Sequence, residues 1–126
     1  MVKSTTETKR AVGSKVHTLR FRAADQEIFS AIKNGKKKVE TRASSTRYES
    51  ITKGDILRFV CGKLEFQKRT SAVKKFGSVK AMLREYKPME INPNIKTASE
   101  LKKMYNSFSG YREKIKRYGL LALELK

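Results

Sequence analysis

Residues 35–42 read GKKKVETR and place four positive charges and one carboxylate between a predicted helix and a predicted strand. An ordinary turn at this point would carry small neutral residues. Side chains alternate between the two faces of a strand, so Val39 and Thr41 should point toward one face. The opposite face then presents a cation–carboxylate–cation row of Lys38, Glu40 and Arg42. Such a row either lies solvated on the surface or lines a cleft that receives a polyanion.

Lys37 lies three residues before Glu40, and strict alternation would put these two side chains on opposite faces. Gly35 can relax the turn enough to swing Lys37 inward. If the two groups converge, Glu40 would hold Lys37 or Arg42 in place and could accept the amino protons of a base. The alternative is a strand with surface salt bridges, which contribute ~0–1 kcal/mol each.

The charge balance of the chain predicts a polyanionic partner. The chain has 126 residues, 38% of them hydrophobic, which is enough for one domain with one modest core. Lys and Arg number 30 against 12 Asp and Glu, which gives a formal net charge of +18. Self-repulsion at this density destabilises a compact state unless a partner absorbs it. We expect RNA, with DNA as an alternative; an anionic membrane would require a basic amphipathic helix with large apolar anchors.

The same composition excludes several classes of protein. The sequence contains no run of about 18 apolar residues and no signal-peptide pattern, so we expect a soluble, cytoplasmic monomer that does not bind membranes. One cysteine and one histidine exclude an internal disulfide and a structural zinc site, and we expect neither a metal nor a cofactor. His17 alone could serve a catalytic triad or pair, but its strand pattern favours a core or rim position. Cys61 ends an apolar strand and should be buried.

The order of elements predicts an α+β domain preceded by a flexible basic arm over residues 1–14. The expected strands cover residues 15–22, 38–42, 56–61, 64–75 and 120–125. Helices are expected over 24–34, over 78–86 and around 101–105, with Thr97 or Ser99 as the cap of the last, and a further helical turn over 111–118. Residues 43–50 and 87–96 are predicted loops. Five or six strands with about three short connecting helices indicate a small curled sheet or β-barrel.

Several landmarks occur in the order and spacing of a known family. They are the G-x-K-x-x-E-x-R pattern formed by Gly35, Lys37, Glu40 and Arg42, the Gly54-Asp55 turn before residues 56–59, and the closing strand YGLLALEL over residues 118–125. Together they resemble the ASCH domain, a PUA-like β-barrel, from about Val16 to Leu125. The resemblance assigns residues 15–126 to that domain.

The resemblance implies a cleft beside the G-x-K-x-x-E-x-R segment and a function in RNA binding or RNA chemistry. Some members of the family are amidohydrolases that act on N4-acetylcytidine, and others have been assigned ribonuclease activity. In the amidohydrolases a lysine at the position of Lys37 acts with a threonine and a later glutamate. This chain has Glu40 at the threonine's position and, by a rough alignment, Asn94 near the glutamate's, with Glu90 the nearest carboxylate. The alternative function is therefore a metal-independent hydrolase with Lys37 and Glu40 as catalytic residues.

The predicted nucleic-acid site combines cations with an aromatic ring. Tyr111, just after Gly110, is the best candidate for an exposed ring that stacks on a base, whereas Tyr105 and Tyr118 are predicted at the core or its rim. Further phosphate contacts are expected from the basic face of the long strand over 64–75. The full predicted set is Lys36, Lys37, Lys38, Glu40, Arg42, Arg47, Lys74, Lys75, Tyr111 and Arg112. A third possibility is a basic ribosome- or nucleoid-associated protein whose cleft has no function.

Overall fold

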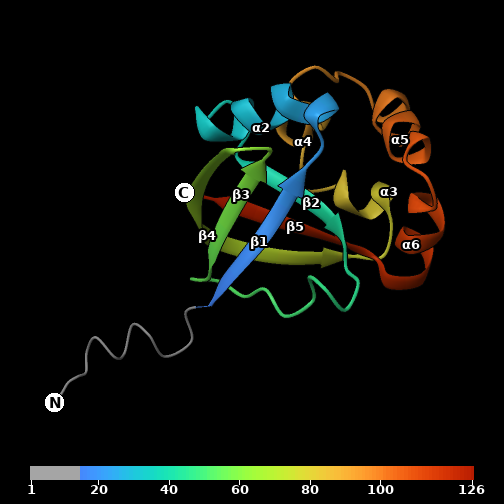
Figure 1. Ribbon diagram of the computed structural model, residues 1–126. Coiled ribbons are helices and arrows are strands. Elements are labelled where there is room, and N and C mark those ends of the chain that lie inside the picture. Colours follow the sequence, from blue (N-terminus) through green and yellow to red (C-terminus); the bar gives the residue numbers. More distant parts are fainter. Residues whose placement is uncertain (1–14) are drawn as a thin grey trace, which may run out of the picture.

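A single five-stranded sheet forms the centre of the computed structural model, which describes residues 15–126 (Figure 1). In chain order the strands are β1 (Val16–Phe21), β2 (Val39–Ala43), β3 (Ile56–Cys61), β4 (Leu64–Phe76) and β5 (Leu120–Leu125). Their order across the sheet is β1-β3-β4-β5-β2, with β1 and β3 parallel and the other three pairs antiparallel. Each predicted strand agrees with an observed one to within one residue at either end.

The sheet curls strongly into a half-barrel, which confirms the predicted α+β class and the curled sheet. Its two edges are β1 and β2, the first and second strands of the chain. Among residues 15–126 the short second strand therefore pairs only with β5, through the register Glu40 to Leu123 and Arg42 to Leu121. The other edge of β2 has no strand partner among residues 15–126.

Two apolar clusters cover the two faces of the sheet, and β5 contributes to both. Leu121, Leu123 and Leu125 point into a cluster formed with β1, β3 and the first helix. Leu120 and Ala122 point into a second cluster formed with the helices of the C-terminal half. Burial on both faces explains why β5 is an almost uninterrupted apolar sequence.

Three helices within residues 15–126 have eight or more residues: α2 (Gln26–Lys33), α5 (Ala98–Ser107) and α6 (Tyr111–Tyr118). A 3-10 turn, η1 (Ala23–Asp25), precedes α2, and together they occupy the predicted helix over 24–34. Of the two candidate caps for α5, Thr97 is the one used, because its hydroxyl accepts the backbone N–H of Glu100. Helices α5 and α6 stand together at one side of the sheet (Figure 1).

Two predictions in the connections were wrong in detail. The helix predicted over 78–86 is one turn, α3 (Val79–Met82). The predicted loop over 87–96 contains another one-turn helix, α4 (Pro88–Ile91). Proline is tolerated at the first position of a helix, where its missing N–H would have no partner. Pro88 therefore starts α4, whose last residue, Ile91, is buried in the core.

The predicted basic arm over residues 1–14 lies outside the described residues. Within residues 15–126, no helix combines the length and the apolar character that crossing a membrane requires. The helices instead pack against the sheet and leave one large cavity beside β2.

Candidate functional site

A cavity of about 680 Å³ lies beside β2, between the end of β1 and the helices α4, α5 and α6. Four of the ten predicted site residues line it: Lys37, Glu40, Arg42 and Tyr111. Its volume is in the range of pockets that hold small ligands.

Lys37 and Glu40 converge, as the hypothesis of a relaxed turn required. Gly35 has a positive φ of 84°, and the backbone N–H of Lys37 donates to the carbonyl of Ala31 at 2.9 Å, which folds the turn back onto α2. Lys37 Nζ then lies 3.2 Å from Glu40 Oε1. The two residues are only 3% and 6% exposed, so this is a buried ion pair and not a solvated row.

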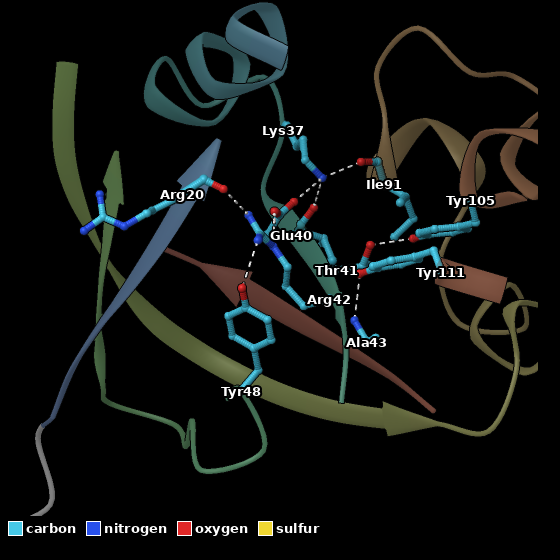
Figure 2. Close-up of polar contacts among 11 residues, drawn as sticks. Arg20, Lys37, Glu40, Thr41, Arg42, Ala43, Tyr48, Ile91, Tyr105 and Tyr111 are labelled. Atoms are coloured by element: carbon cyan, nitrogen blue, oxygen red, sulfur yellow. Dashed lines mark hydrogen bonds and ion pairs between the residues drawn. The ribbon is translucent and has the colours of Figure 1, made fainter. Parts of the chain in front are cut away.

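The ammonium of Lys37 has an acceptor for each of its three N–H groups. Besides Glu40, it donates to the carbonyl oxygen of Val39 at 2.5 Å and to that of Ile91 (Figure 2). Burial lowers the pKa of Lys37, and the charge of Glu40 opposes that shift. Because all three acceptors require a proton on Nζ, this geometry holds the side chain as an ammonium that ties β2 to α4.

Arg42 completes the buried charge cluster and joins the two edges of the sheet. Its Nε donates to Glu40 Oε2 at 3.0 Å, and its terminal nitrogens reach the hydroxyl of Tyr48 at 3.3 Å and the carbonyl of Arg20 at 3.5 Å. The guanidinium also lies over the rings of Phe21 and Tyr48, at 5.0 and 5.5 Å from their centroids. Burial acts to lower the pKa of Arg42, but Glu40 and its other neighbours outweigh it and raise that pKa.

Two parallel tyrosine rings form the opposite wall of the cavity. Tyr105 and Tyr111 stack with centroids 5.9 Å apart and an interplanar angle of 5°. The hydroxyl of Tyr105 bonds to Thr41 Oγ1 at 2.5 Å, and that of Tyr111 accepts the backbone N–H of Ala43 at 2.7 Å, so both rings are anchored to β2 (Figure 2). Burial raises the pKa of both tyrosines, so both phenols are protonated at neutral pH.

These positions refine the expectations for the tyrosines. Tyr105 is buried, as predicted for a core or rim residue. Tyr111 is half-buried and not fully exposed, because α6 turns its ring toward β2. Its ring still faces the cavity, where Phe108 meets it edge-on at 5.6 Å.

The other six predicted residues lie outside the cavity. Lys36 and Lys38 are exposed on either side of Lys37, and the guanidinium of Arg47 lies over the ring of Tyr48 at 5.7 Å from its centroid. On β4, Lys74 is paired with Glu85 at 3.1 Å and with Glu124 at 3.6 Å, and Lys75 is exposed. Arg112 lines a second cavity of about 270 Å³ between α3, α5 and α6.

Several cavity residues were absent from the predicted set: Phe21, Arg22, Tyr48, Phe108 and Lys114. They come from the end of β1, a loop after β2, the α5–α6 connection and α6, so no local spacing connects them. Tyr48 lies in the loop over 43–50. The polar composition of this loop indicated an exposed connection and gave no sign of a cavity residue. Phe108 and Lys114 lie within residues 105–118, where basic and aromatic residues are interleaved. This composition was the signal that could have placed them in the predicted site.

The other residues that were considered for catalysis do not line the cavity. His17 Nε2 lies 2.8 Å from Asp55 Oδ2, and Cys61 is buried in the core; neither lines the cavity. Asn94 donates to Glu27 on the surface, and Glu90 accepts the backbone N–H of Lys87 in the first turn of α4. Within residues 15–126, no three His, Cys, Asp or Glu side chains are grouped so that they could hold a metal ion.

A curled half-barrel with a cavity beside the G-x-K-x-x-E-x-R strand is the architecture expected from the resemblance, and comparison with known families agrees. The ASCH domain matches residues 23–126, and the chain belongs to this PUA-like family.

Two solved structures are similar to the chain. The hypothetical protein PH0355 is 28% identical, with a TM-score of 0.73 over 88% of this chain and 97% of that one. Protein PF0455 from Pyrococcus furiosus is 29% identical, with a TM-score of 0.69 over 88% of this chain and 96% of that one. The comparison with curated proteins gave no match.

Proposed function

We propose that this ASCH domain binds single-stranded RNA and takes one unstacked base into the cavity beside β2. The observation that supports this most directly is the pairing of an aromatic wall with a buried carboxylate in one cavity of about 680 Å³. Sequence-specific proteins recognise single-stranded RNA by stacking splayed-out bases on aromatic rings and by hydrogen bonds to the base edges. The net charge of +18 favours a polyanion in addition.

Glu40 is the group that would recognise the base edge. Its two oxygens each meet one cation, Lys37 at 3.2 Å and Arg42 at 3.0 Å. An ionised carboxylate has about four acceptor positions, so these contacts leave capacity for the amino group of a base. Glutamate accepts such a bond from cytosine N4 in nucleic-acid complexes. The contacts with the two cations fix the orientation of the Glu40 carboxylate for this role.

Tyr111 is the ring on which the base would stack. Its hydroxyl is held by the backbone of Ala43, so the ring plane is fixed before any ligand arrives. A fixed ring loses little conformational freedom on binding, which favours affinity. Stacking of one base on an aromatic side chain contributes about 1–3 kcal/mol in single-stranded complexes.

The test is the anisotropy of a fluorescein-labelled, mixed-sequence RNA of about ten nucleotides, a length within the site sizes of single-strand-binding OB-folds. Binding at low salt should weaken as salt rises, with a log–log slope of about −0.7 for each phosphate contacted. Tyr111→Leu should weaken binding about 5- to 150-fold, and Tyr111→Phe should weaken it much less, since it keeps the ring and loses only the hydroxyl that anchors the ring to Ala43.

Tyr118→Leu is the matched control for Tyr111→Leu. Tyr118 lies on the same helix and is half-buried, but its ring faces Arg117 at 5.4 Å and does not line the cavity. RNA that fails to bind the wild type at low salt would refute the proposal. Equal losses in the two leucine variants would refute the role of the cavity.

A metal-independent hydrolase is a second candidate, and the convergence of Lys37 with Glu40 in the cavity favours it. To act as a nucleophile or base, Lys37 would have to lose a proton and leave its three acceptors. Incubation with N4-acetylcytidine and with RNA tests this candidate directly. Turnover that Lys37→Ala abolishes, and that Lys38→Ala on the exposed neighbour leaves intact, would establish the enzyme. If the wild type shows no turnover of either substrate, the hydrolase is refuted and RNA binding remains the proposed function.

A further inference from the structure

The two buried cations of the cavity, Lys37 and Arg42, are already engaged by the protein, so they do not supply phosphate contacts. Lys37 donates all three of its N–H groups to Glu40 and to two carbonyl oxygens. Arg42 is paired with Glu40 and bonded to the hydroxyl of Tyr48 and the carbonyl of Arg20. The side chain of Arg20 itself points away from this cluster (Figure 2). Phosphates that flank an inserted nucleotide must therefore be met elsewhere.

Arg22 is a cation at the mouth of the cavity, oriented but open to solvent. Its Nε is held by Asp25 Oδ2 at 2.9 Å, and its guanidinium lies over the ring of Phe108 at 5.7 Å from the centroid. The side chain is nevertheless 68% exposed. Its two terminal nitrogens make no hydrogen bond to any residue of the described range, so they can meet phosphate oxygens, which suit the planar guanidinium.

Lys114 is the second such cation, on the wall formed by α6. It is exposed, lines the cavity and has no carboxylate partner among residues 15–126. It follows Tyr111 by three positions, which places the two side chains on the same face of the helix. Its ammonium is therefore available beside the ring that we assign to base stacking.

Contacts along the mouth join these groups into one row. Arg22 lies over Phe108, Phe108 meets Tyr111 edge-on at 5.6 Å, and Lys114 stands one helical turn beyond Tyr111. The row thus has the order cation, ring, ring, cation. Sites that bind single-stranded nucleic acid without sequence preference combine these two elements: cations that follow the backbone and rings on which bases stack.

We infer that the sugar–phosphate backbone of a bound single strand follows the row Arg22, Phe108, Tyr111 and Lys114, with phosphates on either side of the inserted nucleotide contacting Arg22 and Lys114. This inference rests on the proposed function and adds the path of the strand. It does not rely on the further phosphate contacts that were predicted for Lys74 and Lys75 on β4. Lys74 already has two carboxylate partners, and neither lysine lines the cavity.

The experiment compares two double variants that each remove two positive charges: Arg22→Gln with Lys114→Gln, and Lys74→Gln with Lys75→Gln. The probe is the same labelled RNA of about ten nucleotides, titrated at several salt concentrations. The variant at the mouth should bind about tenfold more weakly than the β4 variant. Its log–log salt slope should be smaller in magnitude by about 0.7 for each phosphate that the variant no longer neutralises. Equal affinities and slopes in the two variants would overturn the inference.

Controls separate failure of the path from failure of the function. Wild-type protein that binds no RNA would overturn both, whereas binding that depends on Tyr111 but not on the mouth cations would overturn the path alone. The single variant Lys114→Gln guards against misfolding, because its side chain is exposed and has no charged partner among residues 15–126. A salt slope in that variant unchanged from the wild type would also overturn the inference.

Discussion

Glu40 is the residue on which the candidate site depends. It is 6% exposed and lies between Lys37 and Arg42, both largely withdrawn from water. Removing charges from water is expensive, and their mutual attraction compensates only where geometry and hydrogen bonds are good. Here one carboxylate serves two cations, and the remaining N–H groups of Lys37 reach carbonyl oxygens. The cluster is thus stable as a set and sensitive to loss of its only anion.

We predict that Glu40→Gln destabilises the protein by about 3–5 kcal/mol, because it leaves two buried cations without a counter-charge. Urea unfolding at neutral pH measures this loss. Glu65→Gln is the matched control, since Glu65 forms an exposed ion pair with Arg58 at 2.8 Å and solvent screens that pair. The control should unfold almost like the wild type. An equally stable Glu40→Gln variant would show that the cluster does not act as a buried charge network.

At the level of elements, Asp55 fixes β1 against the turn that precedes β3. Its side chain is fully buried and accepts the backbone N–H groups of Lys15 at 3.1 Å and Thr52 at 3.0 Å, and it also lies 2.8 Å from His17 Nε2. Because β1 pairs only with β3 in the described part of the chain, this carboxylate anchors one edge of the sheet. Since β1 carries Phe21, it also fixes one wall of the cavity.

The pKa of Asp55 gives an acid-unfolding prediction. Burial acts to raise it, but hydrogen bonds from Thr52 and Lys15 and the contact with His17 outweigh burial and lower it below the usual 3.8. The native state therefore binds fewer protons than the unfolded chain around this value. The stabilisation that the ionised Asp55 carboxylate contributes is complete above pH 3.8. It is lost as the pH falls through that value toward the lower pKa of Asp55 in the native state.

We predict that Asp55→Asn costs about 1–3 kcal/mol at neutral pH, because its amide places N–H groups against donors that need an acceptor. The loss should shrink as the solution becomes acidic, since the wild type then loses the same interactions. Urea unfolding at neutral pH and below about pH 4 measures both effects. A loss that stays constant across this range would contradict the assignment to the ionised carboxylate.

At the scale of the whole molecule, charge repulsion is the dominant unbalanced force. The chain carries a formal net charge of +18, and the six ion pairs of Lys and Arg within residues 15–126 involve only five of its acidic residues. Most of the cations are on the surface without a carboxylate partner among these residues. Such a molecule gains stability whenever its charges are screened or met by an anion.

We predict that the thermal midpoint rises between about 10 and about 150 mM potassium chloride, as the Debye length falls from about 30 to about 8 Å and self-repulsion weakens. Differential scanning calorimetry at the two concentrations measures the shift. Saturating RNA should raise the midpoint further. At a free RNA concentration one hundred times Kd, binding adds about 2.7 kcal/mol to the free energy of unfolding. A midpoint that falls with salt would show that attractive ion pairs outweigh the repulsion.

Much of the fold was predictable because its signals are local. Alternating apolar residues or short apolar runs located the five strands, and glycines marked the helix ends and turns. The one-turn helix α4 was missed because four residues are too short to show a period, and Pro88 is equally compatible with a loop. The inward turn of Lys37 could be stated only as a condition on Gly35, since alternation by itself pointed the other way.

The sequence by itself determined the five strands, the α+β class, the family and the strong positive charge, since each follows from neighbouring residues or from composition. Only the tertiary structure decided which cations remain accessible to a phosphate. Folding buried Lys37 and Arg42 with Glu40, paired Lys74 with two carboxylates, and left Arg22 and Lys114 open at the mouth of the cavity. Residues as distant in sequence as Arg22 and Phe108 meet there because the sheet curls and α5 and α6 pack beside its edge. The spacing of residues along the sequence therefore could not predict that Arg22 and Phe108 come into contact.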